Sequence, residues 1–180
     1  SNPSATGYTV GTVLARERQP SPPMARLQPG TIIGGKYQLE QLLGAGGMGS
    51  VWLARHEKLG APFAIKFLRS DLSNDALTRT RFEREAQAAA NLRTRHVVSV
   101  HDFGVEGAHA YMVMEVLEGE DLGVRLKREI RLGLEMVRQL VVQSCRGLHY
   151  AHAAGIVHRD LKPANIFMAL VDGEETVKLL

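Results

Sequence analysis

The sequence His158-Arg159-Asp160-Leu161-Lys162-Pro163-Ala164-Asn165 carries the most chemical information in this chain of 180 residues. It places acid, base, amide and proline within eight positions and leads directly into apolar Ile166-Phe167-Met168. Asp160 can accept a hydroxyl proton or orient a nucleophile, and Lys162 can balance charge on a phosphoryl group. Asn165 can offer a carbonyl oxygen to magnesium. The pattern therefore favours a chemical role over that of a polar surface loop.

A glycine cluster, Gly44-Ala45-Gly46-Gly47-Met48-Gly49, lies upstream between two strand-like segments, 37–43 and 50–54. Backbone N–H groups approach a phosphate most closely where Cβ atoms are absent, so Gly44, Gly46 and Gly49 predict a cover for phosphates. A dinucleotide-binding fold would need this motif to open a helix, whereas here the chain continues as a strand. The alternative is a flexible hairpin turn without a ligand.

A second glycine pattern runs from Gly30 to Lys36 and has the spacing of a Walker A loop. Tyr37 follows it where such a loop needs Ser or Thr for magnesium, and no strand precedes it. We therefore reject a Walker A loop and interpret Gly34-Gly35 as a turn.

Lys66 lies within the apolar strand 62–68, on the face that Ala64 shares and opposite Phe63, Ile65 and Phe67. A lysine in this position faces an interior, a ligand or solvent, and the first two require an anion. Glu85 is a candidate partner, because it falls within the stripe of Phe82 and Ala89 on the next helix. The alternative for Glu85 is a solvated pair with a neighbouring arginine.

The remaining periodicity predicts a mostly antiparallel sheet with one helix, followed by a helical region. The apolar stripe expected on the long second-half helix consists of Val137, Leu140, Val141, Leu148 and Ala151. The expected strands are 31–33, 37–43, 50–54, 62–68, 97–103, 111–116, 166–169 and 176–180, with a turn at 171–173. The expected helices are 75–92, 121–129 and 134–153.

Composition excludes several classes of protein. The 22 basic and 19 acidic residues give a net charge of +3 and are interleaved, which does not indicate nucleic-acid binding. One cysteine, Cys145, excludes an internal disulfide framework. No apolar run approaches the ~20 residues that span a bilayer. Residues 1–28 lack an apolar period, so we expect a disordered N-terminal tail.

Together these motifs resemble the eukaryotic-type serine/threonine protein kinases of the bacterial kind, from about Thr31 to Leu180. The resemblance implies an α+β, protein-kinase-like fold. Its N-lobe, at about 31–116, would be a five-stranded antiparallel sheet with one main helix. The hinge would lie at about 115–120, and 121–180 would be the first part of a mainly helical C-lobe, so that 29–180 forms a partial kinase domain.

The resemblance also implies ATP and Mg²⁺ as cofactors and assigns roles to individual residues. Asp160 takes the role of catalytic base, Lys162 lies beside the γ-phosphate, and Lys66 contacts phosphates while paired with Glu85. Asn165 would bind the metal. Lys162, two residues after Asp160, resembles the serine/threonine class rather than the tyrosine class. The nucleotide-binding residues would be Leu43, Gly44, Ala45, Gly46, Gly47, Met48, Gly49, Val51, Ala64, Lys66, Met114, Glu115, Leu117 and Phe167.

Leu179-Leu180 stands where the family continues into Asp-Phe-Gly, whose aspartate holds magnesium, so we expect these 180 residues alone to transfer no phosphate. The partners implied are ATP and proteins with Ser or Thr, without nucleic acid. The location implied is cytoplasmic, with membrane anchoring of the full-length protein as an alternative. Two other functions stay open: a nucleotide-binding pseudokinase or scaffold, and a kinase-like small-molecule phosphotransferase. The sequence gives no indication of oligomeric state.

Overall fold

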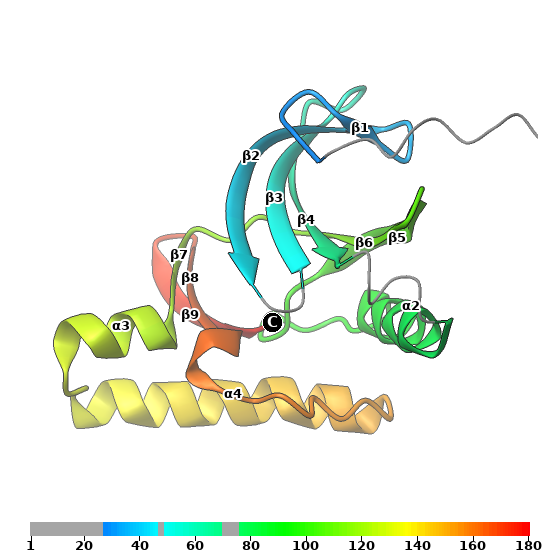
Figure 1. The fold of residues 1–180 in the computed structure, drawn as a ribbon. Helices are drawn as coiled ribbons and strands as arrows, with labels where there is room; N and C mark the ends of the chain where they lie inside the picture. Colours follow the sequence, from blue (N-terminus) through cyan, green and yellow to red (C-terminus); the bar gives the residue numbers. More distant parts are fainter. Residues whose placement is uncertain (1–26, 47–48, 70–75) are drawn as a thin grey trace, which may run out of the picture.

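The computed structural model describes residues 27–46, 49–69 and 76–180, which form two sheets and three main helices (Figure 1). The larger sheet has six strands in the order β1-β2-β3-β4-β6-β5, and every neighbouring pair is antiparallel. Its strands are β1 (Ile32–Ile33), β2 (Tyr37–Gly46), β3 (Gly49–His56), β4 (Pro62–Leu68), β5 (Val100–Glu106) and β6 (His109–Met114). The larger sheet has six strands rather than the expected five, because the two-residue β1 pairs with β2.

Alternation along the strands divides the larger sheet into two faces. Trp52, Ile65 and Val113 are buried together in one apolar core cluster. The opposite face carries Leu68 and Ala110, which pack against Phe82 of helix α2 (Ala76–Ala90). Residues on β4 with even numbers therefore point toward the α2 side, and those with odd numbers point into the core.

The second sheet has three antiparallel strands in the order β7-β8-β9. These are β7 (Gly119–Asp121), β8 (Ile166–Val171) and β9 (Glu174–Leu179). The turn expected at 171–173 is confirmed: Asp172 and Gly173 both have positive φ, the backbone of tight hairpin turns. Strand β7 was missed, since three residues are too few to show a period.

Two helices complete the second half of the chain. Asp121 caps helix α3 (Leu122–Glu129) by accepting a hydrogen bond from the backbone N–H of Val124, at 2.9 Å. Helix α4 runs from Leu134 to Ala153, as predicted. Figure 1 shows α4 below the second sheet, with the larger sheet above and α2 to its side. No helix in the described part of the chain is long and apolar enough to cross a membrane.

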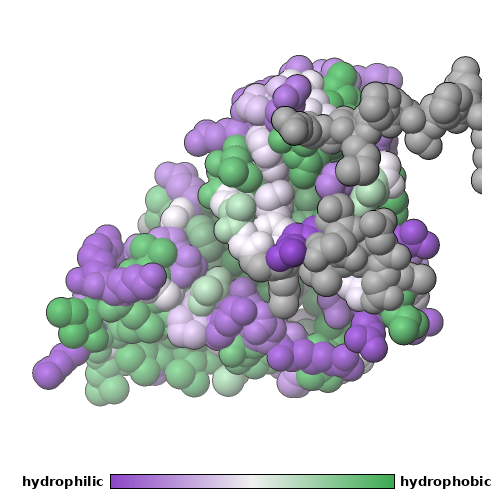
Figure 2. Space-filling model, in the orientation of Figure 1, coloured by the Kyte–Doolittle hydropathy of each residue, from purple (hydrophilic) through white to green (hydrophobic). Residues whose placement is uncertain are grey.

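The predicted stripe of α4 is only partly covered. Leu140 and Ala151 are buried, whereas Val137 and Val141 are exposed by 40% and 56%. Apolar surface gathers over this part of the molecule in Figure 2. Leu140 packs with Met168 and Val177 of the second sheet, so only the side of α4 that faces the hairpin contributes to the core.

Candidate functional site

Asp160, Lys162 and Asn165 form one hydrogen-bonded cluster. Oδ2 of Asp160 accepts from Nζ of Lys162 at 2.7 Å and from Nδ2 of Asn165 at 2.9 Å. Nδ2 of Asn165 also donates to the backbone carbonyl of Asp160, at 2.8 Å. The short 3₁₀ turn η1, Pro163–Asn165, brings Asn165 back to Asp160. The cluster thus places a carboxylate, an ammonium and an amide at one point, on the rim of the second sheet.

The electrostatics of the cluster favour an ionised Asp160. The hydrogen bond from Lys162 lowers the pKa of Asp160, and the bond from Asn165 and the charge of Lys162 act in the same direction. Desolvation raises the pKa and opposes them, but the hydrogen bond from Lys162 is the larger effect. Asp160 is therefore a carboxylate at neutral pH, half-exposed and able to accept a proton or a hydrogen bond.

The backbone around Asp160 is held in an unusual conformation. Arg159 has φ of 61°, a left-handed value that is uncommon for a residue with a side chain. On one side, Nε2 of His158 lies 3.0 Å from the carbonyl oxygen of Leu180. On the other, the N–H of Leu180 donates to the carbonyl of Asn165, at 3.0 Å. Leu180, the residue after β9, therefore contacts both ends of the Asp160 loop.

The larger sheet aligns the predicted nucleotide-contacting side chains on its α2-facing side. Val51, Lys66 and Met112 are register partners across β3, β4 and β6. Cross-strand partners project from the same side of a sheet, so these three share a face. Ala64 and Met114 form the next such pair along β4 and β6. The face combines one ammonium with apolar side chains, which suits a ligand with a flat base and an anionic tail.

The predicted pair of Lys66 and Glu85 is not formed in this structure. Glu85 is exposed, whereas Phe82 and Ala86 of the same helix are buried. Among the described residues, no hydrogen bond or ion pair is recorded between Lys66 and Glu85. The prediction that Glu85 shares the buried stripe of Phe82 is therefore wrong. Glu85 lies only about 60° around the helix from Phe82, but on the side of the stripe that faces solvent.

The glycine cluster forms the tip of the β2–β3 hairpin, where Gly44 pairs with Val51 and Gly46 with Gly49. A Cβ atom at Gly49 would lie 1.8 Å from the carbonyl oxygen of Phe67, and φ there is +149°. Only glycine fits this position. Leu43, Gly44, Ala45 and Gly46 are exposed along the same strand end, and Gly47 and Met48 lie outside the described residues.

The predicted hinge joins the two sheets through an extended segment that begins at Glu115. The N–H of Glu115 donates to the carbonyl of Ser99 at 3.0 Å, and the carbonyl of Glu118 accepts from Leu170 at 2.8 Å. Between these anchors, the described residues provide no recorded backbone partner for the carbonyl of Glu115 or for either backbone group of Leu117. These open groups are the donors and acceptors that a purine base requires.

The hairpin β8–β9 adds one predicted and one missed residue to this region. Phe167 is half-buried and is the register partner of Lys178, so both project from the same face. Lys178 is buried, and its Nζ lies 2.7 Å from Oε1 of Glu115. Lys178 lies between the apolar residues Val177 and Leu179, so it projects from the opposite face of the strand. This position was the sequence signal that could have identified Lys178 as a functional residue.

Among the described residues, the cluster offers one metal ligand, Asn165, and no preformed metal site. Nδ2 of Asn165 is used toward Asp160, which leaves its Oδ1 as a neutral oxygen ligand. The described ranges contain no group of three or more His, Cys, Asp or Glu side chains that could hold a metal ion. Mg²⁺ commonly takes few protein ligands and several phosphate and water oxygens, so Asn165 fits a Mg²⁺ that arrives with a nucleotide.

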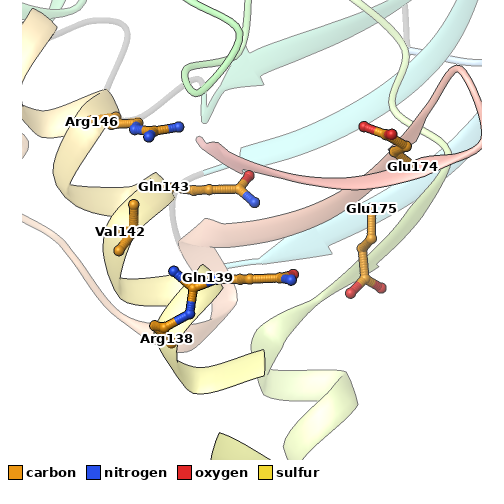
Figure 3. Close-up of a pocket in the computed structure, with 7 residues that line it drawn as sticks. All are labelled: Arg138, Gln139, Val142, Gln143, Arg146, Glu174 and Glu175. Atoms are coloured by element: carbon orange, nitrogen blue, oxygen red, sulfur yellow. The ribbon is translucent and has the colours of Figure 1, made fainter. Parts of the chain in front are cut away.

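Two hollows lie elsewhere on the second half of the chain. One, of about 490 Å³, is polar and lies between α4 and the β8–β9 turn. Figure 3 shows Gln139 and Gln143 of α4 facing Glu174 and Glu175 across it. The other, of about 400 Å³, is apolar and borders Leu161 and Ile166. None of the residues that line the polar hollow is a predicted site residue.

Comparisons with known proteins agree on one family. The model of the protein kinase domain family matches residues 37–180. The chain is 44% identical over 144 residues to the serine/threonine-protein kinase PknA of Mycobacterium tuberculosis strain H37Rv, covering 77% of this chain and 33% of that protein. It is 45% identical over 136 residues to PkaB of Streptomyces coelicolor, covering 76% and 32% respectively.

A solved structure is similar in fold as well. The kinase domain of PknI from Mycobacterium tuberculosis superposes with a TM-score of 0.77 at 30% identity, covering 86% of this chain and 62% of that one. The chain therefore spans about a third of the length of the curated relatives that it matches, and under two thirds of the solved domain.

Proposed function

The chain belongs to the protein kinase domain family, and on that premise we propose that it provides the nucleotide-binding and catalytic-loop part of a serine/threonine protein kinase. The reaction is transfer of the γ-phosphoryl group of ATP to Ser or Thr hydroxyls of proteins. One observation carries the proposal: the cluster in which Asp160 accepts hydrogen bonds from both Lys162 and Asn165.

Each part of the cluster has a role in this reaction. Asp160, kept ionised by Lys162, accepts the proton of the attacking hydroxyl or orients that hydroxyl toward phosphorus. Lys162 offsets negative charge on the transferring group, since it already lies 2.7 Å from Asp160 and is half-exposed. Oδ1 of Asn165 supplies one ligand to Mg²⁺, which when bound neutralises phosphate charge.

The nucleotide would lie between the sheet face of Val51, Ala64 and Lys66 and the hairpin face of Phe167. The open backbone groups of Glu115 and Leu117 would bind the adenine edge, and Lys66 would bind phosphates. Gly44 and Gly46 carry no side chain at the strand end where the phosphates would lie. The space beside each is open, since a Cβ at either position would meet no atom within 4 Å. Glu85 would reach Lys66 only after α2 changes its position, so its role is proposed for the nucleotide-bound state.

The test is phosphoryl transfer from γ-labelled ATP to a generic protein substrate by the full-length protein, followed by phosphoamino-acid analysis. We expect phosphoserine and phosphothreonine, dependent on magnesium. Nucleotide binding without transfer would favour a pseudokinase, and transfer to small hydroxylated molecules only would favour a small-molecule phosphotransferase. Either outcome contradicts the proposal.

We further propose that residues 1–180 alone do not transfer phosphate, because Asn165 is the single predicted metal ligand. The same assay on the isolated 180 residues checks this point. Clear magnesium-dependent turnover by this chain would contradict it.

A further inference from the structure

Lys178 is a buried lysine with one recorded partner. Its side chain is 7% exposed, and its Nζ donates to Oε1 of Glu115 at 2.7 Å. Among the described residues, no other Lys, Arg, Asp or Glu is buried to this extent. A buried ammonium costs several kcal/mol unless it is paired, so the fold must provide Glu115 as its counter-ion.

Glu115 also holds the backbone beside it. The same Oε1 accepts from the N–H of Ser99 at 2.8 Å, while the N–H of Glu115 donates to the carbonyl of Ser99 at 3.0 Å. Ser99 is fixed in turn, because the N–H of Val98 donates to the carbonyl of Leu179 at 2.9 Å. Lys178, Glu115 and Ser99 therefore close a ring of contacts that joins β9 to the start of the hinge.

The position of Lys178 links this ring to the proposed base-binding surface. Lys178 is the register partner of Phe167, and the two side chains share one face of the β8–β9 hairpin. The ammonium of Lys178 thus holds the carboxylate of Glu115, while the backbone of Lys178 pairs with the strand that carries Phe167. The backbone carbonyl of Glu115 has no recorded partner among the described residues, so this ring sets the position of an open acceptor.

We propose that Lys178 is a positioning residue for recognition of the adenine base, acting through Glu115. This inference rests on the proposed function, which places the base at the Glu115 carbonyl. The 6-amino group of adenine needs an acceptor at a defined position, and that position is set by the two hydrogen bonds on Oε1. Without Lys178 the half-buried carboxylate of Glu115 keeps only the N–H of Ser99 as a recorded donor. It then turns toward water, and the backbone of Glu115 loses its fixed position.

The experiment compares the affinities of the full-length protein for ADP and for inosine diphosphate, which lacks the 6-amino group, by isothermal titration calorimetry. Lys178→Met keeps the length and apolar stem of the side chain but removes its charge. We expect this variant to bind ADP about tenfold more weakly, the effect of losing one net hydrogen bond, while its affinity for inosine diphosphate stays the same. Lys178→Arg keeps the charge and should retain the preference for ADP.

Lys36→Met is the matched control, because Lys36 forms an exposed pair with Asp102 at 3.2 Å, away from the hinge. It should bind both nucleotides as the unsubstituted protein does. If Lys178→Met does not fold, the double variant Lys178→Met with Glu115→Leu removes both charges of the pair together and so avoids an unpaired one. The double variant should show the same loss of preference for ADP.

An unchanged ADP preference in folded Lys178→Met, or in the double variant, overturns this inference and leaves the proposed function standing. An equal weakening of both nucleotides also overturns it, since that result indicates a purely structural role. If the unsubstituted protein binds neither nucleotide, the proposed function and this inference are both overturned.

Discussion

Asn165 donates two hydrogen bonds through one nitrogen to Asp160, at 2.9 Å to the side chain and 2.8 Å to the backbone carbonyl. The amide therefore fixes both the rotamer of Asp160 and the loop that carries it. Its oxygen stays available for a metal ion, so a single residue couples the orientation of the proposed base to the proposed Mg²⁺ ligand.

Asp160→Asn should remove phosphoryl transfer while leaving nucleotide binding intact. The amide keeps the shape of the side chain but cannot accept the hydroxyl proton, and general-base catalysis is worth about 10²–10⁴-fold. The measurement is kcat in the full-length protein together with ADP affinity. Asp172→Asn is the matched control, because Asp172 is exposed in the β8–β9 turn and its positive φ suits Asn. Full activity in Asp160→Asn would contradict the role of Asp160.

Lys162→Met should raise the pKa of Asp160 toward its ordinary value. The hydrogen bond from Lys162 is the largest cause of the lowered pKa, and the charge of Lys162 adds to it. With a lowered pKa, Asp160 stays ionised until the pH falls well into the acid range. In the variant it should protonate at a higher pH, which moves the acid limb of activity upward. Titration of the Asp160 carboxyl by carbon-detected NMR measures this directly, with exposed Lys58→Met as the control.

Gly49→Ala should destabilise the β2–β3 hairpin. The new Cβ would lie 1.8 Å from the Phe67 carbonyl oxygen at a φ of +149°. Backbone strain of this kind costs about 1–3 kcal/mol in the free energy of unfolding. Chemical denaturation of the 180-residue chain is the measurement. Gly46→Ala, where a Cβ would meet no atom within 4 Å, should be neutral to slightly stabilising, and an equal loss in both variants would refute the steric explanation.

Tyr37→Phe should remove part of the alkaline unfolding of this protein. Burial and the charge of Asp102, to which the hydroxyl donates at 3.2 Å, raise the pKa of Tyr37 from 10.0 to about 12. Because the unfolded chain ionises Tyr37 first, stability falls as pH rises between these two values. Thermal unfolding from pH 9 to 12 should therefore be less pH-dependent in the variant. Tyr150→Phe, at an exposed tyrosine, is the control, and identical pH dependence in all three proteins would contradict the assignment.

Local periodicity predicted most of the elements, because it reports directly on which face of a segment is buried. Strand β4 and helix α4 begin and end where the pattern indicated. Strand β5 was placed three residues early. Val97 forms an isolated bridge with Leu179 of β9, and Ser99 is hydrogen-bonded to Glu115, so this segment does not pair with β6.

The failures concern contacts between elements. The orientation of α2 decides whether Glu85 meets Lys66, and a rotation of one helix cannot be inferred from its own period. Lys178 was missed for a similar reason, since its pairing with Glu115 depends on how the β8–β9 hairpin meets the hinge. Helical spacing limits which residues share a stripe, but it does not fix which edge of that stripe faces the neighbouring sheet.

The open backbone groups of the segment after Glu115 have a consequence for mutational tolerance. If the main chain itself binds the base, replacing the side chain of Val116 or Leu117 alters the walls of the site but cannot delete the contact. Proline at 117 is the exception, because it has no N–H to donate. Apart from proline at 117, a point substitution leaves in place the main-chain atoms that hold an inhibitor bound in this way, so resistance would have to come from added bulk or altered dynamics.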